Sequence, residues 1–253
     1  MHDRFRHQRY RPPPAGGLGS RGLTPMVQRL LIANAVVFLG QIFMDPSTKL
    51  AGLLGVSVHG VFQAGQIWQP FTYMWAHWSF LHILFNMFGL WIFGPQLEMT
   101  WGSRKFLRFY LLCGIGAGFM ILGWHTLLGE SLSVTLGASG AVFGILTAFS
   151  LMWPDQTIAL LFPPVSFKAI WFIPILFLMQ LMMSDGNISH IGHLGGVLVA
   201  AIILRDELRR AIGFGGLRYR WHRWRMRGRL RSIRRDEFER KRNPKDDDRP
   251  TLH

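Results

Sequence analysis

Charged residues are scarce in this sequence. Asp, Glu, Lys and Arg make up 17% of its 253 residues, whereas about a quarter is usual for a soluble domain. They are also unevenly distributed, because few Lys or Arg lie between Thr48 and Asp185 while both ends of the chain are rich in Arg. Long apolar stretches with the charges near the ends are typical of membrane proteins. The composition therefore predicts an integral membrane protein rather than a soluble domain.

Cysteine is nearly absent as well. Because Cys113 is the single cysteine, no intrachain disulfide can form. Cys113 lies in an apolar run and leaves the redox compartment open. No cleavable signal peptide is expected, because residues 1–25 are basic and rich in Pro and Gly, without an apolar stretch. The zinc-protease pattern H-E-x-x-H does not occur, and no carboxylate accompanies the histidine pairs of the sequence. We therefore expect neither a metal nor another cofactor.

Six apolar stretches are long enough, or nearly so, for a membrane-spanning helix, which needs about 20 residues. The expected spans are residues 26–44, 79–97, 106–125, 137–153, 168–184 and 190–204. The fourth and the sixth are short. The sequence thus predicts an all-α fold with a six-span domain at 26–204, between a basic tail at 1–25 and an Arg-rich tail at 205–253.

The loop charges give this topology a direction. Lys and Arg precede the first span and follow the second and the sixth, whereas Lys49 is the only Lys or Arg in loops 45–78, 126–136 and 185–189. The positive-inside rule therefore predicts that both termini are cytoplasmic, and the bacterial cytoplasmic (inner) membrane is the expected location. Loop 45–78 is long and rich in Trp, Phe and Gly, so we expect an irregular element in the outer interface.

Three spans carry polar residues in their first turns. His82 and Asn86 lie near the start of the second span, Ser139 lies near the start of the fourth, and His193 lies near the start of the sixth. All three spans run from outside to inside, so these side chains are expected at one depth below the outer surface. Polar side chains in a membrane are costly and usually functional.

Serine and histidine at one depth can form a hydrolytic pair. A serine hydroxyl becomes an effective nucleophile when a histidine takes its proton. Ser139 also begins a helix, where backbone N–H groups lack intrahelical partners and can stabilise an oxyanion. His82 and Asn86 are four residues apart, hence on one helical face, and could complete this oxyanion hole. No acid is placed to join the pair, so we predict a dyad of Ser139 and His193.

Small residues predict where two spans touch. Gly140 and Gly144 in the fourth span, and Gly192 and Gly196 in the sixth, have the G-x-x-x-G spacing that lets helix backbones approach in lipid. Because Gly196 follows His193 by about one turn, we expect Gly196 to lie against the fourth span. Val199 is expected to face lipid.

Taken in order, these motifs resemble the rhomboid family of intramembrane serine proteases, over about residues 65–201. The resemblance rests on Gln-Ile-Trp-Gln-Pro-Phe-Thr at 66–72, His77, His82, Asn86, Glu98, Trp101-Gly102, Arg104-Lys105-Phe106, Gly137-Ala138-Ser139-Gly140 and His193-Leu194-Gly195-Gly196. It implies a six-helix bundle and a metal-free endopeptidase that cleaves transmembrane segments of single- or multi-span membrane proteins near the outer face.

The resemblance also implies residue roles. Ser139 would be the nucleophile and His193 the base, with His82, Asn86 and the Ser139 N–H as the oxyanion hole. Supporting positions are Gly137, Gly140, Gly196 and Phe143. Phe143 falls where many members have a tyrosine that stacks on the catalytic histidine, and its ring can still stack. The roles of His77 and His190 stay open.

Two other functions compete with proteolysis. A catalytically silent rhomboid-like protein that binds transmembrane clients is the alternative, although the presence of both Ser139 and His193 favours the protease. A transporter is disfavoured because the polar residues lie near the outer ends of the spans rather than at the midplane.

The C-terminal tail suggests a further contact. Residues 205–242 contain fifteen Lys or Arg against five Asp or Glu, interrupted by Trp221 and Trp224. Basic residues with aromatics can bind nucleic acid. Directly after a final span, however, this composition favours contact with anionic lipid.

Overall fold

The computed structural model describes residues 22–44, 49–160, 165–182 and 190–211. The chain divides into two units, Met1–Leu204 and Arg205–His253. Of the second unit, only helix α9 (Arg205–Ala211) is described, and the Arg-rich sequence that follows α9 lies outside the described residues.

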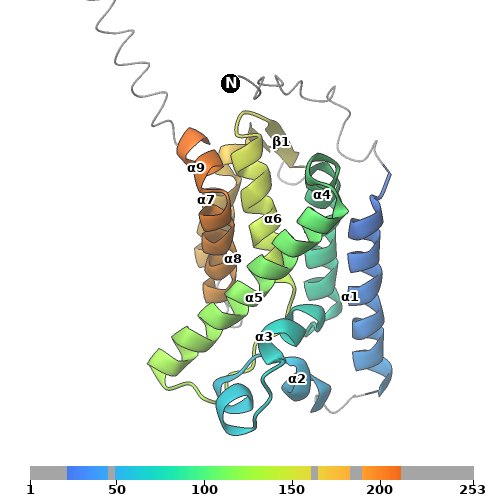
Figure 1. The fold of residues 1–253 in the computed structure, drawn as a ribbon, viewed down its shortest axis with the longest axis vertical. Helices are drawn as coiled ribbons and strands as arrows, with labels where there is room; N and C mark the ends of the chain where they lie inside the picture. The colour runs from blue at the N-terminus through green and yellow to red at the C-terminus, as the bar shows by residue number, and fades with distance from the viewer. Residues whose placement is uncertain (1–21, 45–48, 161–164, 183–189, 212–253) are drawn as a thin grey trace, which may run out of the picture. The chain divides into compact units, whose positions relative to one another are not determined.

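The first unit is mostly helical (Figure 1). Its elements are α1 (Pro25–Met44), α2 (Lys49–Leu54), the π-helical turn η1 (His59–Gln63), α3 (Gln69–Thr72), the 3-10 turn η2 (Tyr73–Trp75), α4 (Phe80–Trp101), α5 (Ser103–Leu128), α6 (Ser139–Met152), strands β1 (Thr157–Leu160) and β2 (Val165–Lys168), the 3-10 turn η3 (Ala169–Trp171), α7 (Phe172–Met182) and α8 (His190–Ile203). Each of the six expected spans overlaps one apolar helix, namely α1, α4, α5, α6, α7 or α8.

An antiparallel hairpin was not expected in an all-α fold. Strands β1 and β2 pair from Thr157 opposite Lys168 to Leu160 opposite Val165, and Lys168 also forms an ion pair with Asp155 at 2.9 Å. The segment contains β-branched residues, which favour a strand over a helix. The fifth apolar helix therefore begins at Phe172, after η3, and not at Lys168.

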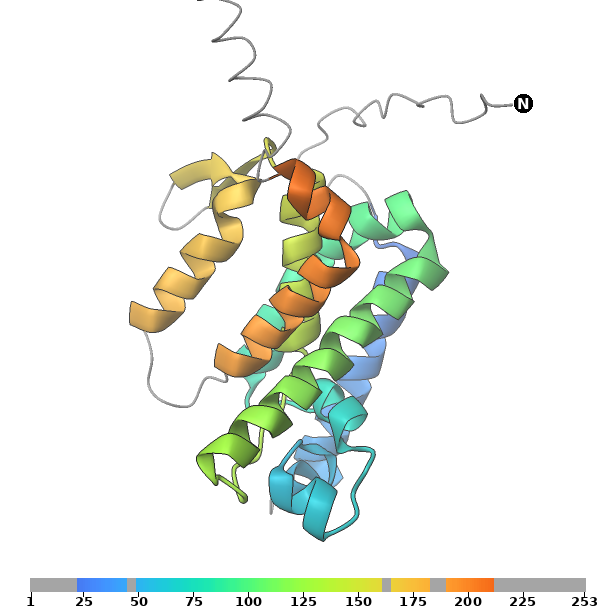
Figure 2. The same ribbon diagram turned by 60° about the vertical axis from the view of Figure 1, so that its left-hand side comes forward.

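Three helices, α1, α4 and α5, are long and apolar enough to cross a membrane. Helices α6 and α8 and the stretch Ala169–Met179 are apolar but shorter. Among these helices α6 is central, packed by α4, α5, α7 and α8 (Figure 2). Its residues from Gly140 to Leu151 are all buried, and the hydroxyls of Thr147 and Ser150 donate to backbone carbonyls one turn earlier. This satisfies the polar groups of a helix that has no solvent face.

Helix α8 lies against both α5 and α6 through small residues. A Cβ atom at Gly196 would lie 1.9 Å from the carbonyl oxygen of Gly140, so the backbones of α8 and α6 are in direct contact. The predicted packing of Gly196 on the fourth apolar helix is confirmed. The prediction for Val199 is wrong: a Cβ atom at Gly116 on α5 would lie 2.5 Å from a Val199 methyl group, so Val199 packs against a neighbouring helix. Val199 is half-buried, and its side chain covers the Gly116 backbone.

The segment between α1 and α4 is irregular, as predicted, and is organised by buried polar groups. Gln69 is fully buried; its side chain accepts the Ser57 N–H at 3.0 Å and donates to the Gly52 carbonyl at 2.9 Å. Val56 forms a two-way backbone bridge with Thr135, which precedes α6. The segment is thereby joined to the chain that leads into α6.

A buried carboxylate fixes the C-terminal end of α4. Glu98 is 3% exposed and accepts the backbone N–H groups of Met26 and Val27, both at 2.9 Å, in the first turn of α1. It also accepts the Ser103 hydroxyl at 2.5 Å, at the start of α5. A carboxylate at helix N-termini satisfies unpaired N–H groups and opposes the positive end of the helix dipole. Glu98 thus joins three helices at one point.

Candidate active site

The candidate nucleophile stands at the start of the central helix. Ser139 is the first residue of α6, and the chain enters the helix through Gly137 and Ala138. Gly137 has φ = 127°, a region that residues with a Cβ atom rarely adopt. Its N–H donates to the Tyr73 carbonyl at 2.9 Å, and the Ala138 N–H donates to Nε2 of His77 at 3.3 Å. Two hydrogen bonds therefore hold the two residues that precede Ser139.

The His82 and Asn86 side chains converge on this entry from α4. A Cβ atom at Gly137 would lie 2.6 Å from Nε2 of His82 and 3.8 Å from Nδ2 of Asn86. Asn86 is buried, and its Nδ2 has no hydrogen-bond partner among the described residues. A buried amide donor without a partner is uncommon, and such a group often has a functional role. The four-residue spacing thus brings both side chains beside the residues that lead into Ser139.

His193 approaches from α8. It is 8% exposed, and its ring lies on the Phe143 ring with 4.3 Å between centroids and 9° between planes. The predicted stacking of Phe143 on His193 is confirmed. Nδ1 of His193 is buried without a hydrogen-bond partner in the described ranges. The ring is therefore oriented by an aromatic face rather than by a described polar side chain.

Backbone contacts join α6 and α8 at the residues next to Ser139 and His193. Gly140 directly follows Ser139, and a Cβ atom there would lie 3.3 Å from the carbonyl oxygen of Gly192, which directly precedes His193. One turn along, Gly196 lies on Gly140 itself. The first turns of the two helices are thus in contact at the residues next to the serine and the histidine.

Two residues in this region were not assigned from the sequence. His77, whose role was left open, is buried at 2% exposure, and its ring meets that of His82 edge-on at 5.1 Å between centroids. Burial, with a further contribution from His82, lowers the pKa of His77 to about 3, so the ring is neutral near pH 7. Tyr73 was missed altogether; its hydroxyl donates to the Gly114 carbonyl on α5 at 2.6 Å. No local pattern marks Tyr73, because its partners are distant in sequence.

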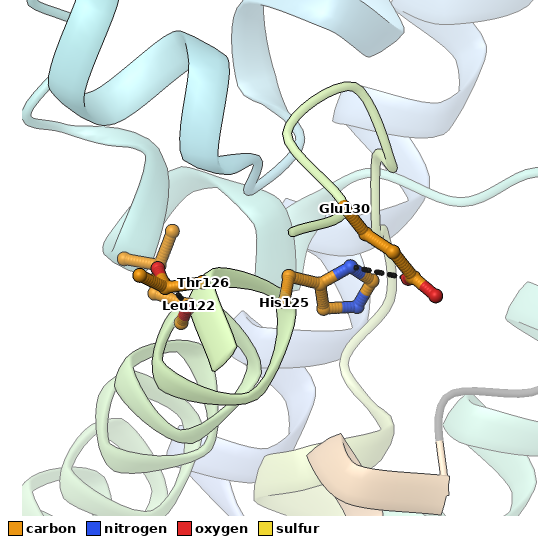
Figure 3. A network of polar contacts seen from close by, with 4 residues as sticks. All are labelled: Leu122, His125, Thr126 and Glu130. Carbon is orange, nitrogen blue, oxygen red and sulfur yellow. Dashed lines mark hydrogen bonds and ion pairs between the residues drawn. The ribbon is translucent and has the colours of Figure 1, made fainter. Parts of the chain in front are cut away.

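The segment between α5 and α6 is also held where it leaves α5. Figure 3 shows His125 in the last turn of α5, with Nδ1 3.1 Å from a carboxylate oxygen of Glu130. The Glu130 N–H donates to the His125 carbonyl at 2.9 Å, and the Thr126 hydroxyl donates to the Leu122 carbonyl at 2.7 Å. With the Val56–Thr135 bridge, these contacts fix the path of the chain toward Ser139.

His190, the other residue left open, is the first residue of α8 and is half-buried. It lies about one turn before His193. Within the part of the chain that the structure describes, no three His, Cys, Asp or Glu side chains gather in a group that could hold a metal ion.

Comparison with known proteins points to one family. The family model described as Rhomboid domain matches residues 64–206, more than half of the chain. Rhomboid protein 1, mitochondrial, of Saccharomyces cerevisiae is 30% identical over 186 residues, covering 62% of this chain and 52% of that protein. RHOMBOID-like protein 6, mitochondrial, of Arabidopsis thaliana is 29% identical over 161 residues, covering 62% of this chain and 49% of that protein.

The rhomboid protease AarA of Providencia stuartii is 24% identical over 204 residues, covering 73% of each chain. The chain spans about half the length, or less, of the first curated relatives that it matches. The family match contains α4, α5, α6 and α8, and with them Ser139, His193, His82 and Asn86. On this match the chain belongs to the rhomboid family, whose members are embedded in membranes.

Proposed function

We propose that this protein is an intramembrane serine endopeptidase with Ser139 as nucleophile and His193 as base. The observation that carries the proposal is the meeting of three helices at one place. The first turns of α6 and α8 touch next to Ser139 and His193, and α4 brings two polar side chains to Gly137. A relative whose name identifies it as a protease supports the same function.

The proposed reaction is acyl transfer in two halves. Oγ of Ser139 attacks the carbonyl carbon of the substrate peptide bond while His193 takes the hydroxyl proton. The carbonyl oxygen becomes an oxyanion, which the Ser139 N–H and the side chains of His82 and Asn86 would stabilise. The intermediate collapses, the C–N bond breaks, and the leaving amine takes the proton from His193. Water then attacks the acyl-serine in the same way, releasing the carboxylic acid and restoring the serine.

Phe143 has a defined part in this proposal. The ring of His193 becomes positive when it takes the proton, and a cation over an aromatic face is favoured by about 0.5–2 kcal/mol. The parallel stack at 4.3 Å also keeps the imidazole plane fixed. Phe143 would therefore orient the base and stabilise its charged form without a hydroxyl of its own.

The proposed setting is a six-span topology with both termini cytoplasmic, in the bacterial cytoplasmic membrane. The supporting observations are the three long apolar helices, the three shorter ones and the distribution of Lys and Arg. Substrates would be single- or multi-span membrane proteins, cut near the outer face. The Arg-rich tail would contact anionic lipid rather than nucleic acid.

Cleavage in a reconstituted bilayer tests the function. Wild-type protein, Ser139→Ala and His193→Ala would be incorporated at equal amounts into vesicles with a labelled single-span substrate. We expect product with wild type alone, because nucleophile and base act as a unit and losing either costs about as much as losing both. Cleavage by Ser139→Ala would refute the assignment. Substrate capture without product by the wild type would instead support the silent client-binding alternative.

Single-cysteine labelling tests the topology. Cys113 is buried, so its background reaction with a membrane-impermeant maleimide should be low. Ser133→Cys, an exposed position before α6, should react in intact cells, whereas Arg205→Cys should react only after permeabilisation. The reverse pattern would overturn the proposed orientation. Reaction of both in intact cells would contradict the three spans, an odd number, that the proposed topology places between residues 133 and 205.

A further inference from the structure

The short segment from Tyr73 to His77 holds the backbone that leads into Ser139. The Tyr73 carbonyl accepts the Gly137 N–H at 2.9 Å, and Nε2 of His77 accepts the Ala138 N–H at 3.3 Å. Two successive N–H groups before Ser139 are thus bound by residues more than sixty positions earlier in the chain. Only one of these two acceptors, the imidazole of His77, belongs to a side chain.

His77 is itself fixed by other elements. Its backbone N–H donates to Oε1 of Gln41 on α1 at 2.9 Å, and its ring meets the ring of His82 edge-on, with 76° between planes. The residue is almost completely buried. It therefore contacts the entry to α6 on one side and the first turn of α4 on another, which are the two places that supply the proposed oxyanion hole.

The hydrogen bond requires one chemical form of the imidazole. A nitrogen that accepts an N–H carries no proton, so Nε2 must be bare and the neutral ring must carry its proton on Nδ1. In a protonated ring, Nε2–H of His77 would point at the Ala138 N–H, and neither group could accept a hydrogen bond from the other. The lowered pKa of His77 agrees with a ring that stays neutral in the folded protein.

We propose that His77 is a positioning residue, which holds the Ala138 backbone and borders the His82 ring so that the nucleophile and the oxyanion-hole donors keep their relative placement. The inference rests on the proposed protease function. In this role His77 touches neither the substrate nor the reacting atoms. Its effect on rate comes through Ser139 and His82, where a displacement near 1 Å is enough to cost about a hundredfold.

Two substitutions distinguish the role of His77 as a hydrogen-bond acceptor from the role of its ring volume. His77→Gln keeps a side-chain oxygen that can accept the Ala138 N–H, whereas His77→Phe keeps a ring against His82 and removes the acceptor. We expect His77→Phe to lower kcat by about tenfold or more with little change in KM, and His77→Gln to recover most of that loss. His59 in η1 is exposed, and its ring contacts Gln63. His59→Phe and His59→Gln are therefore matched controls, expected to leave kcat unchanged.

Amide exchange gives a readout that does not depend on activity. The Ala138 N–H should exchange slowly in wild type and in His77→Gln, and faster in His77→Phe, at equal thermal stability. Fast exchange in the wild type, or equal protection in His77→Phe, would overturn the inference whether or not the protein cleaves a substrate. The nitrogen NMR signals of His77 should also show an unprotonated Nε2, and a protonated Nε2 would overturn it as well.

The kinetic outcomes distinguish the two proposals. Absence of cleavage by the wild type would refute the proposed function, and the exchange and NMR results would still decide whether His77 holds Ala138. Cleavage by the wild type together with unchanged kcat in His77→Phe would refute the positioning role alone. Equal losses in His77→Gln and His77→Phe, with lower melting temperatures for both, would show that His77 serves stability only.

Discussion

A single methyl group at Gly196 should disrupt the proposed site. A Cβ atom there would lie 1.9 Å from the carbonyl oxygen of Gly140 and 2.8 Å from its carbonyl carbon. Carbon and carbonyl oxygen normally approach no closer than about 3.3 Å, so the two backbones must separate by roughly 1.4 Å, the difference between 3.3 and 1.9. Neither contacting atom can rotate away, because both belong to the main chain.

This separation would act directly on the reacting groups. Gly140 follows Ser139, and Gly196 follows His193 by about one turn. Moving one helix away from the other would therefore move the proposed nucleophile away from the proposed base. A misplacement of 1 Å can cost about a hundredfold in rate. We therefore expect Gly196→Ala to lower kcat/KM by about a hundredfold, and Gly196→Val by at least as much.

The assay compares initial rates of cleavage in vesicles at matched amounts of folded protein. Gly123→Ala is the control, because Gly123 is also helical and a Cβ atom there has no neighbour within 4 Å. It should cleave at the wild-type rate. A Gly196→Ala protein that does the same would mean that α6 and α8 do not meet through this glycine, and the geometric argument would fail.

Three other results are expected. Phe143→Leu should lower kcat by about tenfold by removing the stack on His193, while Phe143→Tyr, which keeps a ring, should stay near wild type; loss in both would exclude stacking as the cause. The contribution of His77 to the free energy of unfolding should be greatest above pH 6.5 and fall as the pH drops toward 3, by up to about 1.4 kcal/mol per pH unit. The reason is that burial and His82 lower the pKa of His77 from 6.5 to about 3 in the folded chain. Thermal melting of His77→Gln should show a shallower fall with pH, and equal slopes in the two proteins would contradict this. Gly140→Ala should lose cleavage and regain part of it when combined with Ala117→Gly, whose Cβ is the nearest obstacle at 2.5 Å; a double-mutant cycle without coupling would refute that contact.

The helices could be predicted closely because their apolar runs end near their boundaries. Helices α6 and α8 end within two residues of the expected spans. Helix α4 extends four residues past the expected end at 97, through Glu98 to Trp101. A carboxylate suggests the end of a span, but the backbone N–H groups of α1 satisfy Glu98, so the helix continues. That compensation comes from a contact between distant segments and leaves no mark in the local pattern.

The sequence identified the candidate residues of the site, but not the residues that hold the backbone around them. Serine, histidine and asparagine in the first turns of helices are conspicuous in apolar sequence, so their residues could be named. Tyr73 and His77 form hydrogen bonds to backbone groups near Ser139, and the sequence does not show which backbone groups will need a partner. Val199 shows the same limit, since an apolar residue on a helix can face lipid or a neighbouring glycine equally well.

Gly140 and Gly196, the two glycines of the α6–α8 contact, differ in the atoms that an added side chain would meet. This difference determines which alanine substitution a second substitution can rescue. A Cβ atom at Gly140 first meets the Cβ of Ala117, which a second substitution can remove; the next neighbours are then the Tyr73 hydroxyl at 3.2 Å and the Gly192 carbonyl at 3.3 Å. A Cβ atom at Gly196 meets main-chain atoms of Gly140, and no substitution removes those. Rescue should therefore succeed for Gly140→Ala and fail for Gly196→Ala, whatever residue is trimmed nearby. If trimming a side chain restored Gly196→Ala, the contact that separates Ser139 from His193 would have to be a side-chain contact, and direct backbone packing would not be what sets their distance.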